Sequence, residues 1–193
     1  MSGAIPLAEF IQQLAAKQPT PGGGGAAAAG GALGAAAAHM AAIYTTRKKD
    51  VESGAAEKAT ALMSTLDSQA LLAVADDDAA AYADLQRTWK APDMPATEKA
   101  AIEAKALQVP VALVERCAAQ VAAIEAFLPD CNPNITSDAK VGVHLLAGAA
   151  RSAYQTALVN SPPPETLERL RSLLREVRGA EDRLLGLGEG EQR

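Results

Sequence analysis

The 193-residue chain has few aromatic residues: two Phe, three Tyr and one Trp make up 3% of it. Rings are the largest apolar side chains, and so few of them cannot fill the core of a chain this long. Small aliphatic side chains must therefore form the core. Such a core requires backbones that approach one another closely, which suits packed helices.

The chain also lacks an excess of positive charge. Its 23 Asp and Glu outnumber its 18 Lys and Arg, the two signs are interspersed, and the formal net charge is −5. A protein that binds nucleic acid needs a basic face for the phosphates. We therefore do not expect nucleic acid to be a partner.

Cysteine is almost absent, and so is a secretory leader. The chain has only Cys117 and Cys131, and no basic segment followed by an apolar one at its N-terminus. We expect two buried free thiols rather than a disulfide, and a cytoplasmic protein. The apolar run 26–44 approaches the length of a membrane span. It is made of Ala and Gly with few large aliphatics and contains His39, so we expect no insertion into a membrane.

The apolar residues recur with helical periodicity, and no alternating strand pattern of useful length is present. Helices are predicted over 7–14, from the end of a glycine run to about 46, over 51–89, 97–128 with a kink at Pro110, 137–158, and a last amphipathic segment from about 165. No linker divides these segments. The sequence thus predicts one all-α domain over 1–193, a bundle of about five to six helices, with a flexible tail over about 186–193.

Four consecutive glycines, Gly22 to Gly25, follow Pro21 and lead into an alanine-rich segment. A P-loop needs Lys and Ser or Thr directly after its last glycine, where this chain has Ala26. A dinucleotide-binding fingerprint needs a preceding strand, where this chain has a predicted helix. Two alternatives remain. The glycines let an anion or a flat ligand approach the main chain at a helix N-terminus, or they form a packing loop between helices.

Four stretches carry a resemblance when taken in order: "PTPGGGG" (19–25), "TTRKKD" (45–50), "DDDAAAY" (76–82) and "NPNITSDAKVG" (132–142). Together they resemble the cyclodeaminase/cyclohydrolase family of tetrahydrofolate enzymes. That family includes the cyclodeaminase half of formiminotransferase-cyclodeaminase and stand-alone methenyltetrahydrofolate cyclohydrolases. The chain departs from its pattern at Arg47, at Cys131 and in "NSPPP" (160–164).

The resemblance implies a methenyltetrahydrofolate cyclohydrolase, which adds water to cationic 5,10-methenyltetrahydrofolate and opens it to 10-formyltetrahydrofolate. Two alternatives stay open. One is a formiminotetrahydrofolate cyclodeaminase, which closes a formimino group onto the second nitrogen and releases ammonia. The other is a folate-binding or scaffold protein without catalysis. Neither the cyclohydrolase nor the cyclodeaminase reaction needs a metal or redox cofactor, so tetrahydrofolate is the only small-molecule partner expected. The resemblance also implies a homodimer with folate near the subunit interface.

The resemblance places the chemistry on a lysine and on aspartates. Lys48 is the predicted catalytic lysine, because an amine that faces a cationic substrate away from water gives up its proton readily. Asp76 and Asp78 are the predicted acidic partners. Judged without the resemblance, Lys48 stabilises a helix C-terminus and the aspartates form a solvated face. The hypothesis requires Lys48 and an aspartate to meet at the glycines, from one subunit or from two.

The other candidates are predicted to bind the substrate. Asp138 would accept the adjacent N–H groups of the pterin, with asparagines at the ring edge, although a residue at a helix start also serves as a cap. Cationic side chains or glycine amides would hold the glutamate tail. The predicted substrate-binding residues are Pro21, Gly22, Gly23, Gly24, Gly25, Arg47, Lys49, Asn132, Asn134, Ser137 and Asp138. Two apolar-segment histidines, His39 and His144, are expected to be structural.

Overall fold

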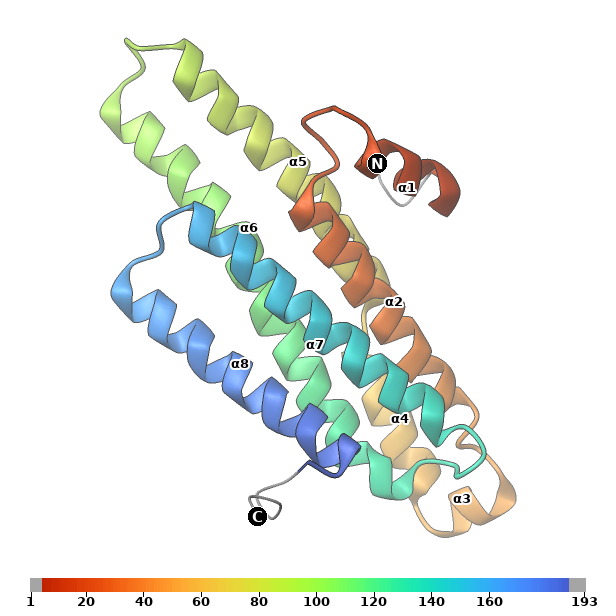
Figure 1. The fold of residues 1–193 in the computed structure, drawn as a ribbon. Coiled ribbons are helices and arrows are strands. Elements are labelled where there is room, and N and C mark those ends of the chain that lie inside the picture. The colour runs from red at the N-terminus through yellow and green to blue at the C-terminus, as the bar shows by residue number, and fades with distance from the viewer. Residues whose placement is uncertain (1–4, 188–193) are drawn as a thin grey trace.

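The structure, a computed structural model, describes residues 5–187 and confirms the all-α prediction. Within that range the chain forms helices and no strand (Figure 1). The helices are α1 (Leu7–Ala15), α2 (Gly23–Ile43), α3 (Lys48–Glu52), α4 (Ala55–Thr65), α5 (Ser68–Lys90), α6 (Ala96–Phe127), α7 (Thr136–Val159) and α8 (Pro164–Leu185), with a 3-10 turn at Leu128–Asp130. The long helices α2, α5, α6, α7 and α8 form the bundle, and α1 lies at its side.

Helix α2 packs between α5 and α7 and has a buried face of alanine and glycine. Its closest approach to α7 is at Gly34 and Gly142. A Cβ on Gly34 would lie 2.9 Å from the carbonyl oxygen of Gly142, and one on Gly142 would lie 2.8 Å from Cβ of Ala38. Both contacts are too close for real side chains, so the two helices can pack this tightly only because both positions are glycine. Small residues thus form the centre of the core, as the shortage of aromatics predicted.

Several predicted boundaries are wrong. Three of the four glycines form the first turn of α2 instead of preceding it, because α2 begins at Gly23. The single helix expected over 51–89 is divided among α3, α4 and α5. Gly54, with a left-handed φ of 79°, separates α3 from α4, and Asp67 caps α5 by accepting the Ala70 N–H at 2.8 Å. Helix α6, in contrast, contains Pro110 in its interior and matches the helix predicted over 97–128 to within one residue at each end.

Helix α8 ends at a left-handed glycine. Gly186 has a φ of 71°, and the N–H of Leu187 donates to the carbonyl of Asp182 at 2.8 Å. This is the hydrogen bond of a Schellman cap. The first two residues of the predicted tail therefore close the helix. The rest of that tail, residues 188–193, lies outside the described residues.

The two cysteines are buried and free, which confirms the expectation from their number. Burial raises the pKa of the Cys117 thiol to about 12, so this residue behaves as an apolar core side chain. Helix α2 is long and apolar enough to cross a membrane by length and composition, and half of its apolar window is buried inside the bundle. Such burial is what a core helix of this composition requires.

Candidate functional site

The predicted site residues gather at opposite ends of α2. Residues 21–25 lie at its N-terminus together with Asp76 and Asp78 of α5, and we call this group the glycine end. Arg47, the lysines of α3 and residues 132–138 lie near its C-terminus, and we call this group the lysine end. A helix of 21 residues rises about 30 Å. Within one chain, Lys48 therefore does not meet Asp76 or Asp78.

At the glycine end, the carboxylate of Asp78 closes the N-terminus of α2. The Gly25 N–H donates to this carboxylate, and a Cβ built on Gly24 would overlap its atoms. Burial raises the pKa of Asp78, and the hydrogen bond from Gly25 opposes that rise. Asp78 is thus a cap supplied by a neighbouring helix, and the third glycine of the run leaves room for it.

The same geometry limits what else the glycine end can bind. Gly24 and Gly25 are buried, and a protein carboxylate already occupies the Gly25 amide, whereas Gly23 is exposed. The peptide bond between Thr20 and Pro21 is cis. Asp76 is half-buried two residues before Asp78 on α5, so its side chain leaves the helix about 200° away from that of Asp78. The exposed main chain of this end is therefore confined to the start of the glycine run.

At the lysine end, Arg47 is bound by Asp50. Nε and Nη2 of Arg47 each donate to a carboxylate oxygen of Asp50 at 2.7 Å, and the Arg47 main-chain N–H donates to the same group at 2.9 Å. The hydrogen bonds from Arg47 hold the pKa of Asp50 below its ordinary value. Asp50 is buried. Arg47 thus fixes the start of α3, and its guanidinium is already paired with a carboxylate.

Both lysines of α3 project from the surface of the chain. The Lys48 side chain is 92% exposed, with Nζ 3.7 Å from a carboxylate oxygen of Glu52, and Lys49 is also exposed. The predicted chemistry needs a lysine that is shielded from water. A single chain does not provide that shielding.

A network of hydrogen bonds joins the end of α2 to the segment before α7. The main-chain N–H of Asn132 donates to Oγ1 of Thr45 at 3.0 Å, and its Nδ2 donates to the carbonyl of Tyr44 at 2.8 Å. Oδ1 of Asn132 accepts the N–H of Asn134. Thr45 is fully buried and also donates to the carbonyl of Ala41 at 2.9 Å. Asn132 is thus committed to the protein's own main chain, and sequence reasoning missed Thr45.

Three of the candidates at this end remain on the surface. Asn134 and Ser137 are exposed, and Asp138 is half-buried in the first turn of α7. Oγ of Ser137 donates to the Asp138 carboxylate at 3.2 Å. No side chain caps α7 at its N-cap residue, Ile135. The carboxylate therefore lies where a helix N-terminus favours negative charge.

His144 has the structural role that was expected of it. Its Nδ1 lies 3.1 Å from Oε1 of Glu181, which is buried and also binds the guanidinium of Arg151. Burial alone would raise the pKa of Glu181, but the hydrogen bonds from Arg151 and His144 lower it. This cluster joins α7 to α8. Among the described residues, no three His, Cys, Asp or Glu side chains are grouped so that they could hold a metal ion.

Comparison with known proteins identifies the family. A family model described as Formiminotransferase-cyclodeaminase matches residues 6–178. The chain is a member of the formiminotransferase-cyclodeaminase family. A search of curated proteins finds no match. Among solved structures, the fold is similar to the crystal structure of formiminotetrahydrofolate cyclodeaminase from Thermotoga maritima, with a TM-score of 0.78 and 23% identity over 98% of each chain.

The family assignment confirms the resemblance carried by the four sequence stretches. In this cyclodeaminase-family chain, two stretches lie at the glycine end and two at the lysine end. Asp78, Arg47 and Asn132 belong to these stretches and bind the protein itself. The exposed candidates in these stretches are Gly23, Lys48, Lys49, Asn134 and Ser137.

Proposed function

We propose that the protein is a formiminotetrahydrofolate cyclodeaminase that works as a homodimer. The family match over residues 6–178 carries this proposal. The structural neighbour from Thermotoga maritima, which is itself a formiminotetrahydrofolate cyclodeaminase, supports it. The sequence analysis preferred hydrolysis of 5,10-methenyltetrahydrofolate. Both comparisons favour the ammonia-releasing reaction instead, so hydrolysis becomes the competing outcome of the test.

The proposed reaction needs proton carriers and no oxidant. N10 of the substrate attacks the formimino carbon on N5 and gives a tetrahedral adduct. Transfer of protons from N10 and from an acid to the formimino nitrogen lets it leave as ammonia, and the cationic 5,10-methenyl bridge remains. Lys48 and Asp76 are the proposed carriers, because each ends in a titratable group and lies in one of the four stretches that carry the family resemblance. Asp138, Asn134 and Ser137 are the proposed contacts of the pterin.

An exposed apolar stripe on α2 supports the homodimer. No Asp, Glu, Lys or Arg occurs between Pro21 and Thr46, although half of this helix faces solvent. Leu33, Ile43 and Tyr44 are 51%, 48% and 59% exposed. Val141 and Leu145 of α7 are also exposed apolar side chains. A second copy of the chain is the occupant that we propose, because a two-fold interface pairs one uncharged surface with itself.

The dimer would also complete the site. If two α2 helices cross in antiparallel orientation, the glycine end of one subunit lies beside the lysine end of its partner. Lys48 of one chain then approaches Asp76 of the other, and both lose contact with water. Leu33→Lys is expected to convert the dimer to a monomer in light scattering and to abolish turnover, whereas Leu185→Lys, at an equally exposed site on α8, retains both. A monomeric wild type would contradict this arrangement.

The activity test uses 5-formiminotetrahydrofolate. The expected result is stoichiometric release of ammonia together with the near-ultraviolet absorbance of the 5,10-methenyl product. If the protein instead accelerates the loss of that absorbance from added 5,10-methenyltetrahydrofolate, and releases no ammonia from the formimino substrate, it is a cyclohydrolase. Binding of either folate without turnover would show a non-catalytic homologue and overturn the proposal.

A further inference from the structure

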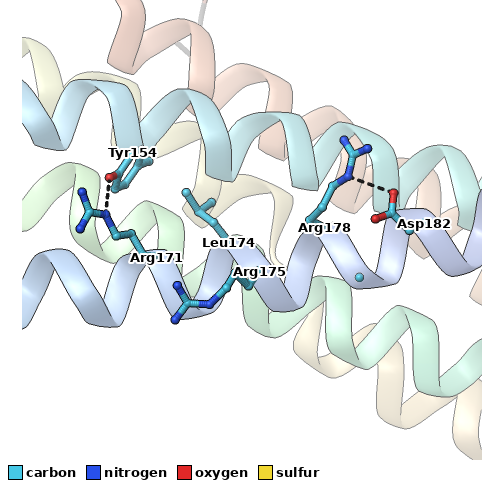
Figure 2. A pocket seen from close by; sticks show the side chains of 7 residues that line it. Tyr154, Arg171, Leu174, Arg175, Arg178 and Asp182 are labelled. Atoms are coloured by element: carbon cyan, nitrogen blue, oxygen red, sulfur yellow. Dashed lines mark hydrogen bonds and ion pairs between the residues drawn. The ribbon is translucent and has the colours of Figure 1, made fainter. Parts of the chain in front are cut away.

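A groove between α7 and α8 has a cavity volume of about 420 Å³ (Figure 2). No residue predicted to bind folate contributes to it. The volume falls within the range of small-molecule sites, about 300–1,000 Å³. The groove is lined by Tyr154, Arg171, Leu174, Arg175, Arg178, Gly179 and Asp182.

The groove arginines do not join helices through carboxylates. Arg171 contacts the hydroxyl of Tyr154 at 3.4 Å. Arg175 pairs with Glu168 and Arg178 with Asp182, each at 2.9 Å and within α8. The other arginines of α8 are different, because Arg169 and Arg183 pair with Glu115 and Glu125 of α6 and so hold α8 to the bundle. The fold does not need the guanidinium groups in the groove for that purpose.

The floor of the groove is apolar. Figure 2 shows Leu174 projecting toward α7 between Arg171 and Arg178, with the ring of Tyr154 on the facing helix, while Arg175 extends outward from α8. Both side chains are half-buried, and Gly179 contributes no side chain. An apolar floor with guanidinium groups at its rim matches a ligand with a flat apolar body and anionic groups at its edge, because guanidinium forms paired hydrogen bonds with carboxylates and stacks on rings.

Two of the arginines are available for two separate anions. Asp182 partly neutralises Arg178. Arg171 contacts the phenol of Tyr154, which carries no negative charge. Arg175 pairs with Glu168, but both of these side chains are 64% exposed, so water screens the pair. Positions i and i+4 are about 6 Å apart along a helix. We infer that the α7–α8 groove binds a small aromatic dicarboxylate, with one carboxylate on Arg171 and the other on Arg175. The net charge of −5 argues against a long polyanion.

The test titrates benzene-1,3-dicarboxylate into the full chain by calorimetry and NMR. We expect saturable binding that shifts the Leu174 methyl and Gly179 amide signals. The variant Arg171→Gln with Arg175→Gln should bind at least about tenfold more weakly. Arg169→Gln, an arginine of the same helix that does not line the groove, should bind as the wild type does. Benzoate, with one carboxylate, should bind about tenfold more weakly than the dicarboxylate.

Three results would overturn the inference: no saturation up to about 10 mM, equal binding by the double variant, or equal affinity for benzoate. A thermal melt of each variant separates loss of binding from loss of fold. The readout is independent of folate turnover. Failure of the proposed function therefore leaves this inference intact, and the reverse also holds.

Discussion

The two ends of α2 differ in how far their charged side chains are held by the fold. At the glycine end, a carboxylate from α5 accepts a main-chain N–H, and the first turn of α2 is largely buried. At the lysine end, Thr45 and Asn132 bind main-chain groups across the α2–α7 gap, and the lysines beyond them project into solvent. One end therefore offers a fixed surface and the other offers mobile charge.

Under the proposed function, this difference would leave a single chain without a complete site. The proposed reaction needs both proton carriers beside the substrate, and α2 places Asp76 about 30 Å from Lys48 and from the proposed pterin contacts. The uncharged stripe between the two ends is the part of the chain that a second copy would cover. Under the proposed function, the dimer would be a condition for catalysis.

Mixing two inactive variants gives the largest expected effect. Lys48→Met and Asp76→Asn should each lower kcat about a hundredfold or more, because each removes a proposed proton carrier. After random exchange of subunits, half of the dimers are heterodimers, and each has one site with both groups intact. Turnover should then recover to roughly a quarter of the wild-type value.

The recovery decides where the site lies. If Lys48 and Asp76 act within one chain, every site in the heterodimer contains one altered residue and no activity returns. A mixture of Lys48→Met with Lys48→Met,Asp76→Asn is the control, because it should stay inactive under either arrangement. Full activity in both single variants would remove these residues from the mechanism.

The lysine end depends on one buried hydroxyl. Thr45→Val keeps the shape of the side chain but leaves the Asn132 N–H without its acceptor. We expect the free energy of unfolding to fall by about 1–3 kcal/mol, the range for a buried group that loses its partner. Thr45→Ser keeps the hydroxyl and should lose about 1 kcal/mol or less. Urea denaturation measures both, and equal losses would show that the methyl group matters more than the hydrogen bonds.

The glycine end is tested by two adjacent alanine substitutions. Gly24→Ala forces the Asp78 carboxylate to move away from Gly25, and we expect a loss of about 1–2 kcal/mol, similar to the loss of a helix cap. Gly23→Ala meets only Cγ2 of Thr156, at 3.6 Å, and should change stability by less than about 1 kcal/mol. The difference in thermal midpoint measures the cap. If the two variants are equally stable, Asp78 does not close α2.

The features that depend on local sequence pattern were predicted correctly. Helical periodicity, the shortage of rings and the small number of cysteines led to an all-α fold with an alanine-rich core and free thiols, and the structure confirms each of these. Apolar periodicity continues across Gly54 and Asp67, so the break of the expected helix at 51–89 was missed. The glycine and the "LDS" capping signal were both visible and could have revealed it.

The partners of the site residues could not be predicted in the same way. Asp78 meets a residue 53 positions earlier in the chain, and Asn132 meets one 87 positions earlier. Such pairings depend on the three-dimensional arrangement of the helices, which periodicity does not specify. The motifs therefore identified the family but could not show that Asp78, Arg47 and Asn132 bind the protein itself.

The smallest expected effect is the opposite response of the two ends to acid. Arg47 lowers the pKa of Asp50 below its ordinary value of 3.8, so the stability that Asp50 contributes is present above pH 3.8 and is lost as the pH falls further. Burial raises the pKa of Asp78 above 3.8, so the folded chain takes up a proton there before the unfolded chain does. Asp78 therefore contributes stability at low pH that is lost as the pH rises through its raised pKa.

The variants Asp50→Asn and Asp78→Asn separate these two contributions. Urea midpoints between pH 3 and pH 6 should fall less steeply on acidification in Asp50→Asn than in the wild type, because that variant has no ion pair to lose. They should fall more steeply in Asp78→Asn, whose amide oxygen still accepts the Gly25 N–H but takes up no proton. The other carboxylates act equally in all three proteins and cancel in the differences. If both variants deviate in the same direction, the two ends of α2 do not differ electrostatically in the way that their contacts require.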